Sequence, residues 1–416
     1  MREVAQRAKA ASRVMAAATT EQKNRALQRI AAELRARTVV IVAANALDLA
    51  DAKASGKNEA FLDRLMLDPS RVEAMAKAVE FIAGLEDPIG EVTESWRRPN
   101  GLEVRKVRLP LGVVLMIYES RPNVTSDAAA LCLKSGNVAL LRGGSEAFRS
   151  NRAIADALMH GLSSAGLPTD AAVLVPDTSR ESMLALLTLD GLIDLCIPRG
   201  GEGLIRFVAE NARVPVVKHY QGVCHVFVHA AADLEMAERI VVNAKASRPG
   251  VCNAMECLLV DEAIAATALP RLAQALVAKQ VELRGCEKTV AALRSAGVPV
   301  TPAAEADFGK EFLELIAAVK VVPGLEGALA HIARYGSEHT EAIVTGSRDA
   351  ARRFTREVCA SAVVVNASTR FNDGGELGLG AEVGISTSRL HAFGPMGVRE
   401  LTAQKFVVEG DGQVRG

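Results

Sequence analysis

Short β-branched runs alternate with helical patterns from about residue 108 onward, and this alternation constrains the fold more than any other feature of the chain. The predicted strands are VRLPLGVVLMIYE, NVALLRG, AAVLVP, LIDLCIPRG, VPVVKHY and CHVFVHA, and helical patterns over 145–164 and 179–187 separate several of them. Strands that alternate with helices pair in parallel through right-handed crossovers. We therefore expect a doubly wound α/β domain.

A second series of the same kind follows along the chain. The runs MECLLV, VELRG, LIAAVKVV, EAIVTG and SAVVVNA are predicted strands, and helices are expected near 263–278 and 325–335. Residues 1–85 differ, because their alanine-rich pattern with apolar spacings of three and four predicts consecutive amphipathic helices. The chain is therefore expected to begin with helices and to continue with two α/β domains.

Two further segments alternate apolar and polar residues like exposed strands. They are RRPNGLEVRKVRLP near 97–110 and the C-terminal LTAQKFVVEGDG. An isolated two-stranded flap is only marginally stable, and an exposed strand tends to pair with another chain. These segments therefore predict a homo-oligomer.

Charge and hydropathy narrow the classes of partner. The 49 basic and 49 acidic residues cancel and no lysine-arginine run is present, so nucleic acid is not an expected partner. No uninterrupted apolar run approaches the roughly 18 residues that cross a bilayer, so we expect no membrane contact. The charged N-terminal segment lacks the apolar centre of a signal peptide, and we expect a cytoplasmic protein.

The cysteines lie mostly inside apolar runs, and their number is odd, which is typical of reduced thiols in a long intracellular chain. No two of them are two residues apart, and no histidine pair four residues apart lies on a helical pattern. The spacing of a zinc motif is thus absent, and the sequence predicts no metal site. The seven cysteines are Cys132, Cys196, Cys224, Cys252, Cys257, Cys286 and Cys359.

Cys252 is the cysteine whose surroundings favour chemistry. A free thiol is only about 3% thiolate at neutral pH, so a nucleophilic cysteine needs partial exposure and nearby positive charge or N–H groups. In ASRPGVCNA the proline and glycine predict a turn, and Lys245 and Arg248 supply charge. Cys257 instead lies in the strand pattern ECLLV, which indicates a buried, inert thiol. On the residues alone, Cys252 is either a nucleophile or an ordinary turn cysteine.

Two glycine-rich turns follow predicted strands and lead into predicted helices. Free backbone N–H groups at a helix N-terminus favour a phosphate, so a dinucleotide is the expected ligand, although each glycine pair also fits a plain tight turn. The arginine before each pair suits the 2′-phosphate of NADP. A third glycine-rich segment, GLGAEVG at 378–384, follows no strand and is expected to be a loop. The candidate cofactor residues are Arg142, Gly143, Gly144, Ser145 and Glu146 in the first turn and Arg199, Gly200 and Gly201 in the second.

Three longer segments give the chain a family resemblance. YESRPNVTSDAAALCLKSGNVALLRGGSE, NAKASRPGVCNAMECLLV and VVPGLEGALAHIARYGSEHTEAIVTG are similar to segments of the gamma-glutamyl phosphate reductases, a family of the aldehyde dehydrogenase superfamily. The resemblance implies an aldehyde dehydrogenase-like α/β fold of two doubly wound domains and a small β oligomerisation flap. The implied ranges are 1–96, 109–225 and 366–392 for a cofactor-binding domain, 226–365 for a catalytic domain, and 97–108 and 393–416 for the flap.

The resemblance also implies an activity. It is the NADPH-dependent reduction of L-glutamyl 5-phosphate to L-glutamate 5-semialdehyde through a cysteine thioester, the second step of proline biosynthesis from glutamate. By motif, Cys252 of RPGVCNA corresponds to the nucleophile and Asn123 of ESRPNV to the oxyanion-hole asparagine. The two glycine turns correspond to the adenosine-ribose contact and the pyrophosphate turn, and Glu311 of KEFLEL is a candidate for the nicotinamide ribose. A transient contact with glutamate 5-kinase, which makes the substrate, is a candidate interaction.

Other residues have roles that the sequence leaves open. Asn123 follows a proline, which also suits an ordinary turn residue. His331 and His339 belong to the family-like segment AHIARYGSEHTEAI, and we expect structural roles for them. Cys257 stands where the resemblance predicts the threonine of NAMETLLV. The candidates for binding the substrate's carboxylate or phosphate, each of which could equally be a solvated surface residue, are Arg248, Lys245 and Arg121.

An absence in the sequence separates two chemistries. Hydrolytic aldehyde dehydrogenases activate water with a glutamate in the strand turn before the catalytic cysteine, and the corresponding stretch VVKHYQGVCHVFV at 216–228 contains no carboxylate. His219 is a weaker candidate base in that stretch. The missing glutamate favours an acyl-phosphate reductase. The alternatives are a hydrolytic NAD(P)-dependent aldehyde dehydrogenase of the same fold and a non-catalytic nucleotide-binding protein.

Overall fold

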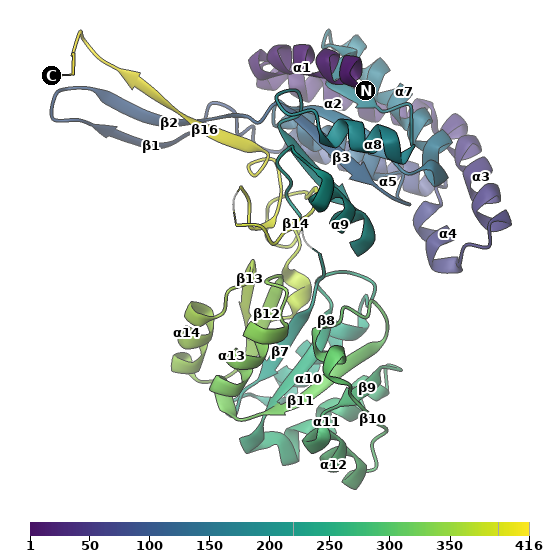
Figure 1. Ribbon diagram of the computed structural model, residues 1–416, viewed down its shortest axis with the longest axis vertical. Coiled ribbons are helices and arrows are strands. Elements are labelled where there is room, and N and C mark those ends of the chain that lie inside the picture. The colour runs from purple at the N-terminus through teal and green to yellow at the C-terminus, as the bar shows by residue number, and fades with distance from the viewer. Residues whose placement is uncertain (219, 390, 416) are drawn as a thin grey trace. The chain divides into compact units, whose positions relative to one another are not determined.

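The computed structural model describes residues 1–218, 220–389 and 391–415, and the chain forms two compact units (Figure 1). No helix in the described part of the chain is long and apolar enough to span a membrane. Unit 1 comprises Met1–Lys218, Leu379–Gly384 and Met396–Gly416, and unit 2 comprises His219–Gly378 and Ile385–Pro395.

Unit 1 contains a parallel four-stranded sheet with the order β5-β4-β3-β6. Every residue of β3 and β4 is buried, as expected for central strands of a sheet that is covered on both faces. Four of the six strands predicted in the first series are thereby confirmed. The strands are β3 (Val113–Tyr118), β4 (Val138–Gly143), β5 (Ala172–Leu174) and β6 (Leu195–Arg199).

Helices follow the strands of this sheet along the chain, and both glycine-rich turns lie between a strand and a helix, as predicted. The first turn joins β4 to a short 3-10 segment and a long helix, and the second joins β6 to a helix directly. The helical segments are α6 (Val124–Lys134), η1 (Ser145–Ala147), α7 (Phe148–Ser164), η2 (Thr169–Ala171), α8 (Arg180–Leu187) and α9 (Glu202–Asn211).

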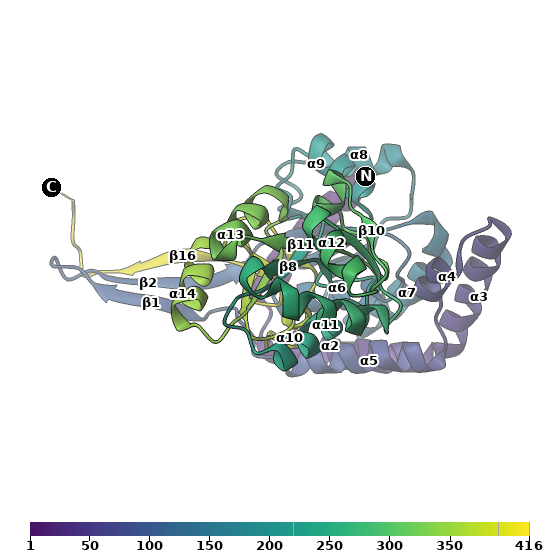
Figure 2. The ribbon, with the colours of Figure 1, turned by 90° about the horizontal axis from the view of Figure 1, so that it is seen from below.

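Consecutive helices form the start of unit 1, which confirms the prediction for residues 1–85. The second of them begins at a capping box, in which the Thr19 hydroxyl accepts the Gln22 N–H and the Gln22 side chain accepts the Thr19 N–H. This second helix, α2, packs against α5 and α7, and Figure 2 shows α5 lying along it. The helices are α1 (Arg2–Ala17), α2 (Thr20–Ala36), α3 (Thr38–Ala54), α4 (Glu59–Leu65) and α5 (Pro69–Gly84).

A separate antiparallel sheet of three strands extends away from the helices of unit 1 in both views (Figures 1 and 2). Its order is β1 (Val92–Arg97), β2 (Glu103–Pro110) and β16 (Thr402–Glu409). The exposed strands expected near 97–110 and at the C-terminus are thus confirmed as β2 and β16. The third strand, β1, was missed, because VTESWR has only two large apolar residues and a register shift near its start.

Unit 2 is built on a parallel seven-stranded sheet with the order β10-β9-β11-β8-β7-β12-β13. It contains all strands of the second predicted series and adds β7, from the last predicted strand of the first series, and the short β10. The strands are β7 (Cys224–Val228), β8 (Met255–Asp261), β9 (Glu282–Gly285), β10 (Thr301–Pro302), β11 (Ile316–Val322), β12 (Thr340–Val344) and β13 (Ala362–Val365).

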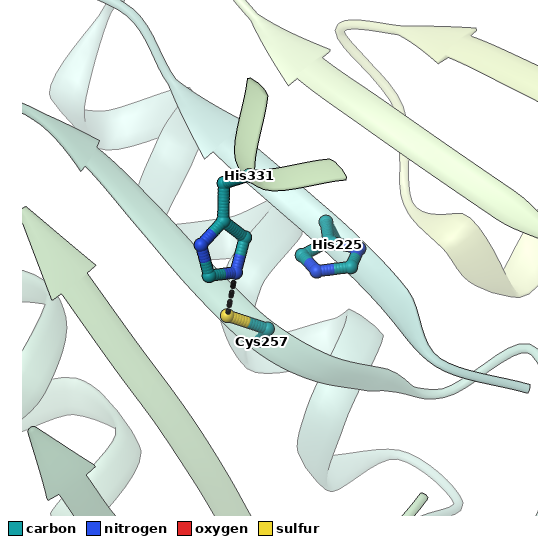
Figure 3. A group of neighbouring side chains, drawn as sticks. All are labelled: His225, Cys257 and His331. Carbon is teal, nitrogen blue, oxygen red and sulfur yellow. Dashed lines mark hydrogen bonds between the residues drawn. The ribbon is translucent and has the colours of Figure 1, made fainter. Parts of the chain in front are cut away.

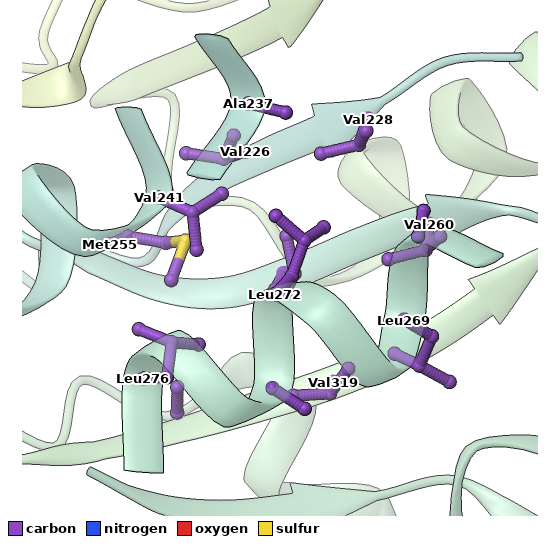
Figure 4. Packing of buried hydrophobic residues seen from close by; sticks show 14 of the residues in the cluster. Val226, Val228, Ala237, Val241, Met255, Val260, Leu269, Leu272, Leu276 and Val319 are labelled. Carbon is purple, nitrogen blue, oxygen red and sulfur yellow. The ribbon is translucent and has the colours of Figure 1, made fainter. Parts of the chain in front are cut away.

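Two apolar layers cover this sheet because alternate residues of each strand point to opposite faces. On one face Val226 and Val228 pack with the helices α10 (Leu234–Ala246) and α11 (Ala265–Val277), as Figure 4 shows. On the other face Phe227 packs with residues of α13 and α14. The remaining helical segments of unit 2 are η3 (Glu262–Ile264), α12 (Glu287–Ser295), η4 (Glu305–Gly309), α13 (Gly324–Tyr335), α14 (Arg348–Glu357) and η5 (Thr369–Phe371).

One predicted strand is wrong. In VPVVKHY at 214–220, only Val216 makes a β-bridge, to Cys196, and no strand is formed among the described residues. The chain passes from unit 1 to unit 2 just after Lys218, so the backbone leaves the sheet of unit 1 after a single pairing. His219 lies outside the described residues.

The predicted domain ranges also differ from the compact units. Unit 2 begins at His219 and not at residue 226, and it includes residues 366–378 and 385–392, which the prediction gave to the cofactor-binding range. A physical reason is Asn372, whose backbone carbonyl accepts from Asn253 (3.0 Å) and whose amide donates to Thr340 Oγ1 (2.8 Å). The short strands β14 (Ile385–Ser386) and β15 (Gly394–Pro395) pair with each other in this unit. The GLGAEVG segment is a loop, as predicted.

Candidate active site

Cys252 lies in the turn that joins α10 to β8 in unit 2, and its side chain is partly exposed. The helix ends at Ala246, and the chain then passes through Pro249 and Gly250, as the sequence predicted. Cys257, by contrast, is fully buried in β8. Of these two cysteines, only Cys252 is therefore accessible to a substrate.

The segment that leads into β7 packs closely against the backbone of the Cys252 turn. A Cβ atom added to Gly222 would lie 2.1 Å from the Cys252 carbonyl oxygen, so only glycine allows this close approach. The Cys224 thiol, at the start of β7, donates to the same carbonyl (Sγ···O 3.1 Å). Sequence reasoning missed both residues, because each lies about thirty positions from Cys252 and acts only through the fold.

The residue after the nucleophile candidate is anchored in the interior. Asn253 is buried, its amide donates to the Asn372 carbonyl, and its carbonyl oxygen accepts from the Arg370 guanidinium. Burial, and then repulsion by Arg248, lower the pKa of Arg370, so two guanidinium groups lie close together beside this turn. Positive charge of this kind favours a thiolate and attracts an anionic substrate. Arg370 had no recognisable motif in the sequence.

Lys245 is not at the surface. Its ammonium group donates to Glu256 (Nζ···Oε2 2.6 Å), and both side chains are fully buried. Burial lowers the pKa of Lys245, and burial raises the pKa of Glu256 to about 7. The pair joins the end of α10 to β8 across the turn that holds Cys252. This placement favours a positioning role for Lys245 over the substrate contact that the sequence suggested.

The segment that contains Glu311 lies next to the same turn. Leu313 has a φ of 57°, in the left-handed region, and its N–H donates to Glu256 Oε1 (3.2 Å). Glu311 is partly buried, and its charge acts on both Lys245 and Glu256. The structure therefore brings Glu311 into the neighbourhood of the Cys252 turn. Arg248 is exposed on that turn.

Asn123 lies in unit 1, at the N-cap of α6. It makes no side-chain capping bond there, and its amide instead donates to Asp127 one turn later (Nδ2···Oδ2 2.8 Å). Burial raises the pKa of Asp127 to about 6, although Asn123 and Ser126 act in the opposite direction. The second amide hydrogen of Asn123 is left for another acceptor. Asp127 is thus a positioning residue that sequence reasoning missed.

Asn123 and Asp127 line a cavity of about 240 Å³ in unit 1. Two arginines and several apolar side chains form the rest of its wall. These residues are Arg64, Met66, Leu67, Arg71, Ala74, Met75 and Ala78. Arg121 is exposed two residues before Asn123.

The first glycine turn is tightly packed. A Cβ atom on Gly143 would lie 2.2 Å from the Asn151 amide, and one on Gly144 would lie 2.3 Å from the Glu146 carboxylate. That carboxylate accepts the Ser120 N–H (2.7 Å), which ties the turn to the end of β3. Ser145 begins the 3-10 segment that follows. Gly143 is therefore favoured by packing against the buried Asn151, whereas at Gly144 the Glu146 carboxylate would have to move to admit a larger residue.

The Arg142 side chain is buried and forms hydrogen bonds within the protein. Its side chain is only 7% exposed, and its guanidinium donates to the Thr178 and Ser179 carbonyls. Burial lowers its pKa. Its Nε atom is buried, with no hydrogen-bond partner among the described residues. The structure therefore favours a structural role for Arg142 over a contact with a 2′-phosphate.

The second glycine turn, at the start of α9, fits a phosphate. No described side chain caps this helix, and among the described residues no atom lies within 4 Å of a Cβ built on Gly201. The Gly201 N–H donates to the Glu119 carboxylate (N···Oε2 3.2 Å). Uncapped N–H groups beside open space are the features that a bound phosphate uses. Arg199, partly buried, precedes the turn and lies against Gly384.

The candidate catalytic pair comes from both units. Asn123 belongs to unit 1 and Cys252 to unit 2, so their joint role stays a prediction. His339 is buried beside the support of the Cys252 turn, with its Nδ1 3.6 Å from Cys224 Sγ and 2.7 Å from Thr340 Oγ1. This placement agrees with the structural role expected for it.

Comparison with known proteins gives the family to which the chain belongs. The chain matches the aldehyde dehydrogenase family over residues 1–295. It is 60% identical over 415 residues to a gamma-glutamyl phosphate reductase from Anaeromyxobacter sp. (strain Fw109-5), covering 100% of this chain and 97% of that protein. A protein of the same name from Sorangium cellulosum (strain So ce56) is 57% identical over 420 residues, covering 100% of this chain and 97% of that protein.

Solved structures show the same relationship. The crystal structure of a gamma-glutamyl phosphate reductase from Thermotoga maritima is similar with a TM-score of 0.97 and 47% identity, covering 100% of this chain and 99% of that one. An acetylating aldehyde dehydrogenase from Geobacillus thermoglucosidasius has a TM-score of 0.69 at 18% identity, covering 100% of this chain and 97% of that one. The second likeness concerns the fold alone. The predicted aldehyde dehydrogenase-like fold is confirmed.

Proposed function

The chain belongs to the gamma-glutamyl phosphate reductases of the aldehyde dehydrogenase family, and we propose that it reduces L-glutamyl 5-phosphate to L-glutamate 5-semialdehyde and phosphate. Members of this family are oxidoreductases, and this reaction is the second step of proline biosynthesis from glutamate. The observation that supports the proposal most directly is the Cys252 turn. It combines a partly exposed thiol, a glycine-supported backbone and two nearby guanidinium groups.

Cys252 is the proposed nucleophile. Its thiolate attacks the acyl carbon of the substrate, a carbon–sulfur bond forms, and the carbon–oxygen bond to the phosphate breaks, so that phosphate leaves with the electron pair. The tetrahedral oxyanion needs donors that are already aimed at it. We assign this role to the Asn123 amide, which Asp127 orients, and to the Cys252 backbone N–H. Arg248 is a proposed contact for the anionic substrate and Arg121 a second candidate, whereas the buried Lys245 is assigned a positioning role through Glu256.

NADPH is the proposed cofactor, and when bound it supplies the hydride that reduces the thioester to the aldehyde. The uncapped N-terminus of α9 with Gly200 and Gly201 is the proposed pyrophosphate site. Arg199 is the proposed contact for the 2′-phosphate, since Arg142 donates to backbone carbonyls. The first glycine turn is assigned to the adenosine ribose and Glu311 to the nicotinamide ribose.

The missing carboxylate in residues 216–228 explains the choice of chemistry in this proposal. Without a base to activate water, the thioester survives until it is reduced or, in the reverse direction, until phosphate captures it. Phosphate is already an anionic nucleophile and needs little activation. The same absence disfavours the hydrolytic alternative.

The larger assignments follow from this function. We assign cofactor binding to unit 1, catalysis to unit 2 and oligomerisation to the sheet of β1, β2 and β16. A transient contact with the kinase that makes the unstable acyl phosphate fits the same proposal, as does a cytoplasmic location.

The phosphate requirement tests the proposed reaction. The enzyme is given L-glutamate 5-semialdehyde and NADP⁺ with and without inorganic phosphate, and the absorbance of the reduced nicotinamide is followed. We expect sustained reduction of NADP⁺ only with phosphate, because phosphate is needed to release the acyl group from Cys252. The forward reaction is checked with L-glutamyl 5-phosphate generated in place by a kinase.

A matched control is arsenate, which replaces phosphate as the acyl acceptor and also permits turnover. Sustained reduction of NADP⁺ in phosphate-free buffer, at a rate comparable to that with phosphate, would instead support the hydrolytic alternative. Absence of turnover in either direction, with NADPH binding retained, would support the non-catalytic alternative.

A further inference from the structure

Three ligand-type side chains meet inside the apolar layer of unit 2 that faces α13 and α14. His225 lies on β7, Cys257 on β8 and His331 on α13, and all three are buried. Figure 3 shows the two imidazole rings next to each other and close to the Cys257 side chain, with the His331 ring joined to the sulfur by a dashed line. Phe227 and Leu259 are among the apolar residues of the same layer, while Glu341 bonds to His225 and the charge of Lys320 acts on His331. The proposed reaction uses none of these side chains.

Their spacing is that of a metal centre. One ligand atom from each residue lies within 4.8 Å of the other two, and Cys257 Sγ is 3.6 Å from His331 Nε2. Zinc–nitrogen bonds of about 2.0–2.1 Å and a zinc–sulfur bond of about 2.3 Å place such atoms about 3.3–3.6 Å apart in a tetrahedral site. The cysteine–histidine pair already has this separation. Since no two of these ligand atoms are more than 4.8 Å apart, the pair that is farthest apart needs to approach by about 1.5 Å at most.

A carboxylate holds one of the histidines in the orientation that metal ligation needs. His225 Nδ1 is 2.8 Å from Glu341 Oε2, and the same oxygen accepts the His225 backbone N–H. A histidine that ligates a metal through one ring nitrogen is commonly held by a carboxylate at the other. His225 Nε2 is buried and has no hydrogen-bond partner within the described ranges. A buried polar atom without a partner is costly, and a metal ion would satisfy it.

We propose that His225, Cys257 and His331 bind a zinc-class transition metal ion, with Glu341 orienting His225. The ligands are Nε2 of each histidine and the Cys257 thiolate, a nitrogen and sulfur set that Zn²⁺ prefers. The fourth tetrahedral position is taken by a water molecule or another small ligand. Binding removes the thiol proton of Cys257. Burial lowers the pKa of His225 and Glu341 raises it, to a net value of about 10, so the ion also displaces a proton from Nε2.

The ion would join α13 to two neighbouring strands of the sheet. β7 also contains Cys224, which supports the Cys252 turn, so the site would stiffen the frame on which that turn rests. The site is specific to this chain in one respect. The family resemblance predicts threonine at position 257, and threonine offers no soft ligand.

The test is metal binding by the full-length chain without a histidine tag. The purified protein is incubated with Zn²⁺ or Co²⁺, freed of loosely bound ion by gel filtration, and analysed by mass spectrometry for metal content. We expect near-equimolar metal. The Co²⁺ form is expected to show visible d–d bands of a tetrahedral site and a thiolate-to-metal charge-transfer band in the near ultraviolet.

Two variants make the result decisive. Cys257→Thr installs the residue that the family resemblance predicts and is expected to fold, but it should lose the charge-transfer band and most of the bound metal. Cys359→Ser removes an exposed cysteine elsewhere in unit 2 and should retain both. Equal metal content in wild type and Cys257→Thr, or a Co²⁺ spectrum without thiolate ligation, would overturn the proposal. In that case the three side chains form only a hydrogen-bonded network.

Discussion

At the scale of single residues, a cysteine becomes a candidate nucleophile through its surroundings. Cys252 and Cys257 are five positions apart, yet one lies in a partly exposed turn and the other is fully buried in a strand. The turn places guanidinium groups near Cys252 and a glycine beneath its carbonyl. The strand places Cys257 against two histidines. Cys252 is thus placed to act as a nucleophile, and Cys257 is placed to act as a metal ligand.

Replacing the nucleophile tests this assignment. We expect Cys252→Ser to reduce turnover below detection, because a serine hydroxyl in this turn has no base to activate it. The matched control is Cys359→Ser, which alters an exposed cysteine outside the turn and should keep nearly full activity. The measurement is kcat in the phosphate-dependent assay, with circular dichroism to verify folding. Equal losses in the two variants would contradict the role of Cys252.

The Asp127 carboxyl gives a pH dependence of stability. Burial raises its pKa from 3.8 to about 6 in the folded protein, so at intermediate pH the folded state retains a proton that the unfolded state has released. The stabilisation is fully present below pH 4 and is lost as pH rises through about 6, a change on the order of 1 to 3 kcal/mol. The free energy of unfolding in urea, measured for wild type and Asp127→Asn from about pH 4 to 7, checks it.

In that comparison the stability of wild type relative to Asp127→Asn should fall between about pH 4 and 6 and then level off, because asparagine does not titrate. A difference that is independent of pH across this range would contradict the raised pKa. A difference that grows with pH would have the wrong sign and would contradict it as well.

At the scale of elements, the three-stranded sheet of unit 1 displays large apolar side chains to solvent. Phe406 and Val408 of β16 are 62% and 55% exposed, and Phe406 contacts Trp96 of β1 edge to face, with ring centroids 6.2 Å apart. Contiguous apolar side chains of this kind mark association surfaces on otherwise polar strands. β16 is also an edge strand whose outer backbone groups are unpaired within the sheet.

We expect the double variant Phe406→Glu, Val408→Glu to dissociate the proposed homo-oligomer into smaller species, because it places charge on the apolar face. The matched control is Lys405→Glu, which introduces the same charge on the alternate face of the same strand. Sedimentation velocity over a range of protein concentrations reports the assembly size. If both variants sediment like wild type, oligomerisation does not depend on this face.

At the scale of the whole molecule, the proposed catalysis needs contributions from both units. Asn123 belongs to the unit with the proposed phosphate-binding turn, and Cys252 belongs to the other. Asn123 is at the start of a helix, and Cys252 is in a turn between a helix and a strand.

Asn123→Ala tests whether the two units act together in the transition state. Loss of a single oxyanion donor typically lowers kcat by about 10² to 10³, with a much smaller effect on KM. Steady-state kinetics with the semialdehyde, NADP⁺ and phosphate measure both constants. A change confined to KM would mean that Asn123 binds the substrate and does not stabilise the oxyanion.

The sequence by itself determined the fold class, the strand order along the chain and the two glycine turns, because periodicity and turn chemistry are local properties. Short motifs with a family resemblance also made Cys252 and Asn123 the candidate catalytic pair, and their roles stay predictions. It mispredicted VPVVKHY, where a local β pattern has no strand to pair with beyond one bridge. Only the tertiary structure decided that Lys245 is buried against Glu256 and that Arg142 donates hydrogen bonds to backbone carbonyls of a loop.

The tertiary structure alone also brought together His225, Cys257 and His331, because their positions in the sequence do not have the spacing of a metal-binding motif. These residues lie on separate elements far apart in sequence, and parallel strands joined by long crossovers bring them together. Local motifs encode sites whose ligands are close in the chain, whereas this group depends on the register of β7 against β8 and on the docking of α13. Packing of the apolar layer sets both, and only a folded sheet provides it.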